Sequence, residues 1–121
     1  MPAYVFRIGK IEGIAMVSFE DFKKLSMKIA KIKEVKEHPN ADKLYVIKVD
    51  LGEEERELVA GIKKAYLPEE LEGKLVVVVD NLEPAIIRGI ESRGMILATQ
   101  DENMLAIICP DKAVSPGSTV K

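Results

Sequence analysis

Apolar residues in this chain occur in short runs, each closed by turn-forming residues, and this spacing restricts the fold more than any other feature. Runs of strand length are expected over residues 27–35, 44–51, 57–62, 74–80, 85–90, 95–99 and 105–109. Gly, Pro, Asn or Asp separates most of them, as is typical of turns between strands. The strands are too dense, and the helical segments too short, for a βαβ architecture or a dinucleotide-binding domain.

Two short helices are predicted among these strands. Ser18 begins a sequence that resembles a capping box and predicts a helix over residues 19–25, whose two phenylalanines, three residues apart, share a buried face. Pro68 in a first turn and Gly73 beyond the last turn predict a second short helix over residues 68–71. This second helix falls between the third and fourth strands.

The first strand is predicted to bend. Its apolar alternation slips by one position between Ile29 and Ile32, which indicates a β-bulge near Ala30 and Lys31. Three strands, a helix and two more strands, with the first strand bent, form the element order of an OB-fold barrel. We therefore predict an all-β OB-fold barrel with a short N-terminal helix and extra C-terminal strands.

The 121 residues are enough for one hydrophobic core. Residues 18–121 are predicted to form the OB-fold domain, and residues 1–17 an N-terminal extension in which alternating apolar residues suit a short extra strand. No apolar run approaches the roughly 20 residues that cross a bilayer. Because the N-terminus also lacks a signal-peptide pattern and the single cysteine cannot form an internal disulfide, a cytoplasmic protein without membrane contact is expected.

Charge is unevenly distributed along the chain. The net charge is −2 and the pI about 5.5, whereas a generic nucleic-acid binder is basic. Residues 22–48 nevertheless carry eight lysines against three acids, a net charge of +5, while residues 50–57 carry a net charge of −4. Either both stretches are solvated surface, or a nucleic-acid surface is confined to one part of an acidic protein.

The residues that usually carry catalysis are scarce. His38 and Cys109 are the only histidine and cysteine. Cys109 ends an apolar strand and is predicted to be a small buried hydrophobe. Neither a nucleophile–base pair, a metal-ligand set nor a phosphate-binding glycine loop is recognisable. The chain is therefore predicted to be no enzyme, with no catalytic residue, metal or cofactor.

Polar residues instead gather in predicted loops and strand ends. In an OB fold the first loop and the loop between strands four and five frame the ligand face. Residues of these segments and nearby turns are His38, Asn40, Asp42, Lys43, Asn81, Arg88, Ser92 and Arg93. Aromatic residues are 5% of the chain, with only Tyr45 and Tyr66 near the presumed face, which favours recognition of RNA shape and phosphates over base stacking. Taken singly, each residue also has a structural reading: Asn40 and Asp42 capping turns, Arg88 pairing with a glutamate, Met95 filling the core.

Five motifs in this order and spacing resemble a known family. They are HPNADKL (38–44), LVAGI (58–62), YLPEELEGK (66–74), NLEP (81–84) and RGIESRGM (88–95). Over residues 19–121 the chain is similar to the tRNA-binding domain at the C-terminus of methionyl-tRNA synthetase, which also occurs as a free-standing tRNA-binding protein and in endothelial-monocyte-activating polypeptide. The resemblance implies an OB fold that binds the outer corner of tRNA with little sequence preference, and a homodimer built through the C-terminal strands, burying residues 105–109.

The resemblance also implies a set of tRNA-binding residues. Lys43 and Arg88 correspond to phosphate contacts, and Met95 to a contact with a sugar or base face. Asn81 and Ser92 offer short hydrogen bonds to ribose or phosphate, and Asn40 completes the set. Two positions depart from the family pattern: Ala30 replaces a glycine in the first strand, and Ile87 replaces a basic residue before Arg88.

Three functions remain open at this point. The first is tRNA binding, as the β subunit or C-terminal part of a methionyl-tRNA synthetase or as its separate partner. The second is a dimeric protein- or peptide-binding module, since a branch of the same family resembles export-assisting chaperones. The third is an assembly domain that only dimerises and docks to a synthetase.

Overall fold

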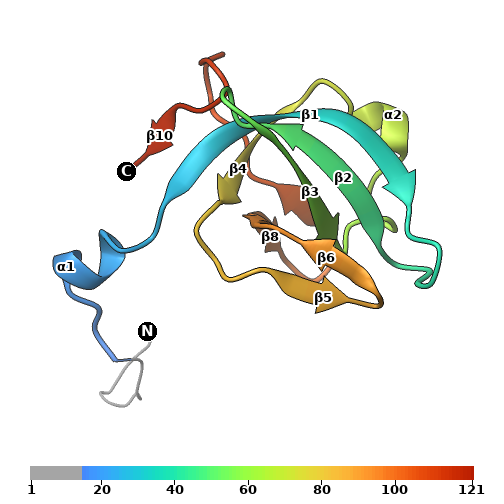
Figure 1. Cartoon of the computed structure of the whole chain (residues 1–121), viewed down its shortest axis with the longest axis horizontal. Coiled ribbons are helices and arrows are strands. Elements are labelled where there is room, and N and C mark those ends of the chain that lie inside the picture. Colours follow the sequence, from blue (N-terminus) through green and yellow to red (C-terminus); the bar gives the residue numbers. More distant parts are fainter. Residues whose placement is uncertain (1–14) are drawn as a thin grey trace.

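The longest strand, β1 (Met27–Glu37), crosses the whole molecule and organises a six-stranded antiparallel sheet (Figure 1). The computed structural model describes residues 15–121. Five strands follow the order β3-β2-β1-β4-β7, and β10 pairs with the start of β1. The strands of this sheet are β1, β2 (Tyr45–Asp50), β3 (Glu55–Ala60), β4 (Leu75–Val79), β7 (Met95–Ile96) and β10 (Thr119–Val120).

A small hairpin brings the two edges of this sheet together into a nearly closed barrel. β5 (Ala85–Ile87) and β6 (Ile90–Ser92) form the hairpin, and its base lies against β3. The Arg93 amide donates to the Glu57 carbonyl oxygen at 3.0 Å, and the Val59 amide donates to Ser92 Oγ at 2.9 Å. The predicted all-β, OB-like fold is confirmed.

The bend of β1 lies further along the strand than the sequence indicated. The register against β2 shifts between Ile32 and Glu34, so the bulge is at Lys33 and not at Ala30 and Lys31. Ala30 and Ile32 both face the core, and Ile29 is buried on the opposite face of the strand. There the Ile29 amide donates to the Ser118 carbonyl oxygen and the Gly117 amide donates to the Ile29 carbonyl oxygen. Burial of Ile29 on the face away from the core therefore produced the apparent slip in alternation.

The core fills the barrel with aliphatic side chains and is closed at one end by α2 (Pro68–Leu71), whose predicted bounds are confirmed. Leu71 is fully buried, and the Leu67 amide donates to the Glu70 carboxylate at 2.7 Å, which caps the helix. The largest fully buried side chains are Ile32, Ile47, Leu58, Leu71, Val49, Val76 and Val78. Each contributes about 1.5–3 kcal/mol of hydrophobic stabilisation.

Titration of one buried phenol links this core to pH. Tyr45 is 2% exposed and its hydroxyl donates to the Tyr66 carbonyl oxygen at 2.7 Å. Burial raises the pKa of Tyr45 above its ordinary value of about 10. As pH rises, Tyr45 therefore ionises first in the unfolded chain. The contribution of Tyr45 to the free energy of unfolding is intact below about pH 10 and is lost as pH rises through the folded pKa. We expect the free energy of unfolding to fall at alkaline pH in the wild-type chain and not in Tyr45→Phe. In the folded wild-type protein, the phenolate absorbance of Tyr45 should appear at a higher pH than that of an exposed tyrosine. A Tyr45 that ionised at its ordinary pH would contradict the prediction.

The N-terminal helix is shorter and more exposed than predicted. Helix α1 (Phe19–Phe22) begins where Ser18 Oγ accepts from the Asp21 amide at 3.0 Å, which confirms the cap. Its phenylalanines do not share a buried face, because Phe19 is 70% and Phe22 39% exposed. The extra strand expected near the N-terminus falls within residues 1–14, outside the described residues. No helix of residues 15–121 is long and apolar enough to span a membrane.

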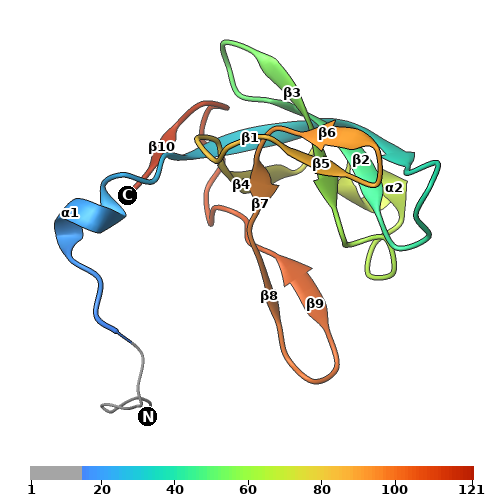
Figure 2. The ribbon, with the colours of Figure 1, turned by 60° about the horizontal axis from the view of Figure 1, so that its bottom comes forward.

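The C-terminal part differs from the sequence prediction in three places. Residues 85–90, predicted as one strand, form the β5–β6 hairpin instead. Residues 95–99 divide between β7 and β8 (Ala98–Gln100), and β8 pairs with β9 (Leu105–Ile107) in a separate hairpin that projects from the barrel (Figure 2). Cys109 is exposed beyond the end of β9, so its predicted burial is wrong for the single chain.

Candidate functional site

The turn of the β5–β6 hairpin places a cationic residue in an unfavourable backbone conformation. Ile87 pairs with Ile90, so Arg88 and Gly89 form a two-residue turn with φ of +53° and +93°. Asn-Gly suits such a turn, whereas a long side chain in the left-handed region costs about 1–2 kcal/mol. Backbone strain of this kind concentrates at functional sites, where the surrounding structure maintains it.

Loop 38–44 and the hairpin turn are held together by hydrogen bonds. His38 Nε2 lies 3.0 Å from the Ile87 carbonyl oxygen, and the Asn40 amide donates to His38 Nδ1 at 3.0 Å. Asn40 Nδ2 donates to the Arg88 carbonyl oxygen, and Arg88 Nη2 donates to the Asn40 carbonyl oxygen, both at 3.3 Å. We call these four residues, His38, Asn40, Ile87 and Arg88, the loop–hairpin junction. In both ribbon views loop 38–44 and the hairpin turn lie side by side (Figures 1 and 2).

Two cations, one in the junction and one beside it, are exposed to solvent. Lys43 lies on loop 38–44 and Arg88 at the hairpin turn, and both are exposed. Within residues 15–121, neither forms an ion pair, so Arg88 pairs with no glutamate of this part of the chain. Their positive charges are therefore available to an anionic ligand.

Most of the lysine-rich segment is neutralised by neighbouring carboxylates. Five of its eight lysines form ion pairs of 3.0–3.6 Å, namely Lys23–Glu20, Lys24–Asp21, Lys28–Asp80, Lys36–Glu34 and Lys48–Glu34. The net charge of +5 read from residues 22–48 therefore overstates the positive surface. The other three lysines of the segment are Lys31, Lys33 and Lys43. Lys31 and Lys33 lie on β1, and only Lys43 lies on loop 38–44.

A groove of about 390 Å³ runs between the hairpin and the β2–β3 strands. Its charged lining is balanced: three cations and three acids, namely Lys48, Arg56, Arg93, Glu55, Glu57 and Glu91. Arg56 donates two hydrogen bonds to Glu54, at 3.1 and 3.2 Å, and these lower the pKa of the Glu54 carboxyl and raise the pKa of Arg56. The guanidinium of Arg56 is thereby held within the protein, so this groove offers less free positive charge than the exposed side chains of Lys43 and Arg88.

Two of the residues predicted to bind RNA already have structural partners. Ser92 is not in a turn but in β6, 4% exposed; its hydroxyl accepts from the Val59 amide and donates to the Gly94 carbonyl oxygen at 3.2 Å. Asn81 accepts from the Ser26 amide at 2.9 Å and donates to the Lys24 carbonyl oxygen at 2.7 Å. These contacts close the barrel and fix the start of β1.

The other predicted residues are distributed between the junction and β7. Asn40 belongs to the junction, and Met95 is 48% exposed on β7, so it does not fill the core. The two tyrosines expected near the ligand face are packed inside instead: Tyr45 is buried, and the Tyr66 hydroxyl accepts from the Ile107 amide at 3.0 Å. The Tyr45 ring is therefore not available for stacking, and the Tyr66 ring is half-buried against the core.

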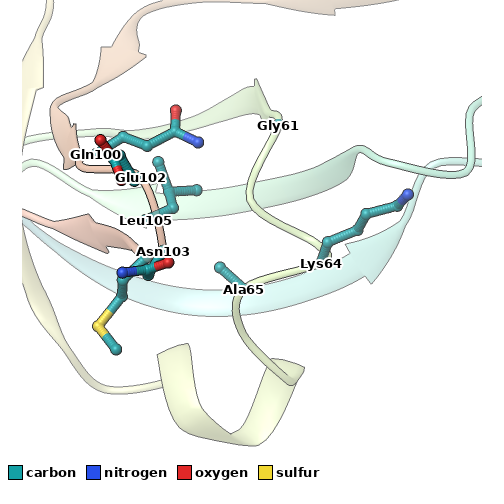
Figure 3. A pocket seen from close by; sticks show the side chains of 8 residues that line it. Gly61, Lys64, Ala65, Gln100, Glu102, Asn103 and Leu105 are labelled. Atoms are coloured by element: carbon teal, nitrogen blue, oxygen red, sulfur yellow. The ribbon is translucent and has the colours of Figure 1, made fainter.

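A second cavity, of about 480 Å³, separates the β8–β9 hairpin from the loop after β3 (Figure 3). It is lined by Gly61, Lys64, Ala65, Gln100, Glu102, Asn103, Met104 and Leu105. Lys64 points away from the β8–β9 residues in this view. Across residues 15–121, no group of three or more histidine, cysteine or acidic side chains is placed to hold a metal ion.

Sequence reasoning missed the contact between His38 and the hairpin, and the position of the hairpin turn. A glycine between two short apolar runs is compatible with a two-residue hairpin turn, and Gly89 provides this part of the signal, although Arg88 is not the usual residue before it. The contact between His38 and Ile87 had no local signal, since the two residues are 49 positions apart.

Comparisons with known proteins identify what this arrangement is similar to. The family model described as "Putative tRNA binding domain" matches residues 27–119. The methionine–tRNA ligase of Pyrococcus abyssi is 58% identical over 113 residues, which are 93% of this chain and 16% of that protein. The chain therefore spans about one sixth of that ligase. With 113 of 121 residues aligned, the match reaches into the first nine residues, so part of the predicted extension has a counterpart there.

Solved structures give the same fold. A MetRS related protein from Pyrococcus horikoshii superimposes with a TM-score of 0.83 and 34% identity, covering 89% of this chain and all of that chain. The chaperone CsaA from Bacillus anthracis superimposes with a TM-score of 0.80 and 28% identity, covering 88% of this chain and all of that chain.

Proposed function

Because the chain belongs to the family of tRNA-binding domains, we propose that it binds tRNA without catalysing a reaction, and that the loop–hairpin junction is the centre of its binding surface. The observation that carries the proposal is the exposed Arg88, held at φ +53° by contacts with Asn40. An unpaired cation kept in a strained conformation is better explained by a ligand than by stability.

In this proposal the contacts are mainly to the RNA backbone. Lys43 and Arg88 bind phosphate oxygens, and exposed Met95 packs on a sugar or base face. Asn40 orients Arg88 and offers a hydrogen bond at the edge of the surface. Ser92 and Asn81 support the hairpin and β1 through their internal hydrogen bonds. Since phosphates carry no sequence information, different tRNAs are bound with similar affinity.

The direct test is tRNA binding by the whole chain across a salt series. Each phosphate neutralised contributes about −0.7 to −0.9 to the slope of log affinity against log salt concentration. We expect a clearly negative slope, similar affinities for several tRNA species, and weaker binding to an unstructured single strand of the same length. A flat response, or no binding at low salt, would contradict the proposal.

The similarity to methionine–tRNA ligases supports a role beside a methionyl-tRNA synthetase, as its β subunit, its C-terminal part or a separate cytoplasmic partner. A binding domain that only helps to hold tRNA lowers the KM for tRNA and leaves kcat unchanged. Adding the chain to a synthetase that lacks such a domain, in cis or in trans, and measuring charging kinetics tests this role. An unchanged KM in both arrangements would argue against it.

We also propose that the chain forms a homodimer through the β8–β9 hairpin and the segment after it. Met104 is 68% exposed and Ile108 40% exposed, and Cys109 is exposed beside them. Pairing of two copies would cover this apolar surface and the free edge of the hairpin. Sedimentation equilibrium tests the proposal: a dimer is expected at micromolar concentration, and a monomer throughout would contradict it.

The second candidate function is a dimeric protein- or peptide-binding module. It is favoured by the structural similarity to the chaperone CsaA and by the exposed apolar side chain of Ile86 on the β5–β6 hairpin, which is 70% exposed. Competition separates the two candidates. If the chain binds an unfolded polypeptide, does not bind tRNA, and keeps the polypeptide bound when tRNA is added, the chaperone-like function is favoured.

A further inference from the structure

His38 is the one buried titratable group of loop 38–44, and both of its ring nitrogens are engaged. The ring is 5% exposed. Because the Asn40 amide can only donate, Nδ1 must accept, and the neutral ring then carries its proton on Nε2, facing the Ile87 carbonyl oxygen at 3.0 Å. One tautomer therefore joins the loop to the hairpin.

We propose that His38 is a positioning residue for tRNA binding: its Nε2–H holds the β5–β6 hairpin against loop 38–44, so that Arg88 and Lys43 keep a fixed separation. The inference rests on the proposed function and deepens it, because His38 itself does not touch the RNA. It assigns to the single histidine the task of pre-organising two cations that lie on different loops.

The hairpin needs such a contact. Its two strands have three residues each, and a two-stranded hairpin of this size is at best marginally stable alone. The hydrogen bonds to β3 lie at its base, at Ser92 and Arg93. At its turn the two bonds between Asn40 and Arg88 are exposed and 3.3 Å long, so the shorter, part-buried His38–Ile87 bond is the strongest link there.

Two conservative replacements distinguish the roles of the two ring nitrogens of His38. The amide nitrogen of glutamine reaches the position of Nε2, so His38→Gln keeps the donor to Ile87. The amide of asparagine reaches only the position of Nδ1, so His38→Asn keeps the acceptor for the Asn40 amide and loses the link to the hairpin. Both replacements remove the ring from the same buried site, so similar losses in thermal stability are expected.

Affinity for tRNA is then compared among the whole-chain variants. We expect His38→Gln to bind within about twofold of wild type, and His38→Asn and His38→Ala about fivefold more weakly, as the loss of one ordinary hydrogen bond implies. Tyr45→Phe, which loses a buried hydrogen bond to Tyr66 and none of the bonds of the junction, should bind as wild type does. If asparagine rescues binding and glutamine does not, His38 only shapes its own loop and the inference is overturned.

Two measurements judge the inference without RNA. Imidazole ¹⁵N chemical shifts of the native protein should show a neutral ring protonated at Nε2; protonation at Nδ1 would overturn it. Amide hydrogen exchange in the β5–β6 hairpin should be faster in His38→Asn than in His38→Gln, and equal rates would also overturn it. If the wild-type chain binds no tRNA, the proposed function fails, and these two measurements still decide whether His38 holds the hairpin.

Discussion

Replacing Gly117 by alanine is expected to destabilise the domain by about 3 kcal/mol, because the added methyl group combines backbone strain with overpacking. Gly117 has a φ of +93°, and a Cβ there would lie 2.6 Å from the Leu51 carbonyl oxygen. Gly52 faces it with the same φ, and a Cβ on Gly52 would lie 2.7 Å from the Pro116 carbonyl oxygen. The turn after β2 and the C-terminal segment thus cross backbone to backbone.

The consequence of losing this crossing extends to β1. The Gly117 amide donates to the Ile29 carbonyl oxygen at 2.7 Å, and the Ile29 amide donates to the Ser118 carbonyl oxygen at 2.8 Å. Urea unfolding of Gly117→Ala and of Gly73→Ala measures the effect. Gly73 has a φ of +90° with nothing within 4 Å of a Cβ, so alanine there costs only about 1 kcal/mol of backbone strain. Equal losses in the two variants would mean that the crossing is not as close as described.

Replacing Arg88 by asparagine is expected to change stability and binding in opposite directions. Asparagine suits the left-handed position before Gly89, so the variant should be about 1 kcal/mol more stable than wild type. The lost phosphate contact should weaken tRNA binding about tenfold, equally for all tRNA species, and reduce the salt slope by about one phosphate. Urea unfolding and tRNA binding across the salt series provide the two measurements.

Lys74→Asn is the matched control for this variant. It removes the same charge beside α2, at the opposite end of the barrel from the hairpin (Figure 1). We expect its tRNA affinity to fall by less than about twofold, since an exposed charge more than a Debye length of about 8 Å from the RNA is screened. If Arg88→Asn binds tRNA as tightly as wild type, or no more weakly than Lys74→Asn does, Arg88 is not part of the binding surface.

Much of the fold could be predicted because its signals are local. The bounds of α2 follow from Pro68 at its first position and Gly73 after its end. Alternation and turn residues likewise placed β2, β3 and β4 within two residues of their observed ends. The bulge in β1 could not be placed this way, because Ile29 is buried although it lies outside the main core, and its backbone bonds to a segment almost 90 residues further along the chain.

The candidate site was less predictable for the same reason. The residue types and their loops were read from the motifs. No neighbouring residue in the sequence indicates that the side chains of Ser92 and Asn81 form their hydrogen bonds within the protein. The turn at Arg88 did carry a local signal, but the apolar residues on both sides resembled one continuous strand. The pairing of His38 with Ile87 required the barrel to be formed first.

The measurement that tests the central claim most directly is the mapping of the tRNA contact surface by NMR. Amide shifts of the ¹⁵N-labelled chain are followed as tRNA is added at low salt. We expect the largest changes in residues 38–44 and 86–90, around Lys43 and Arg88, with small changes in α2 and β4. Saturable binding that instead perturbed the β8–β9 hairpin, and left the loop–hairpin junction unchanged, would contradict the assignment of this surface.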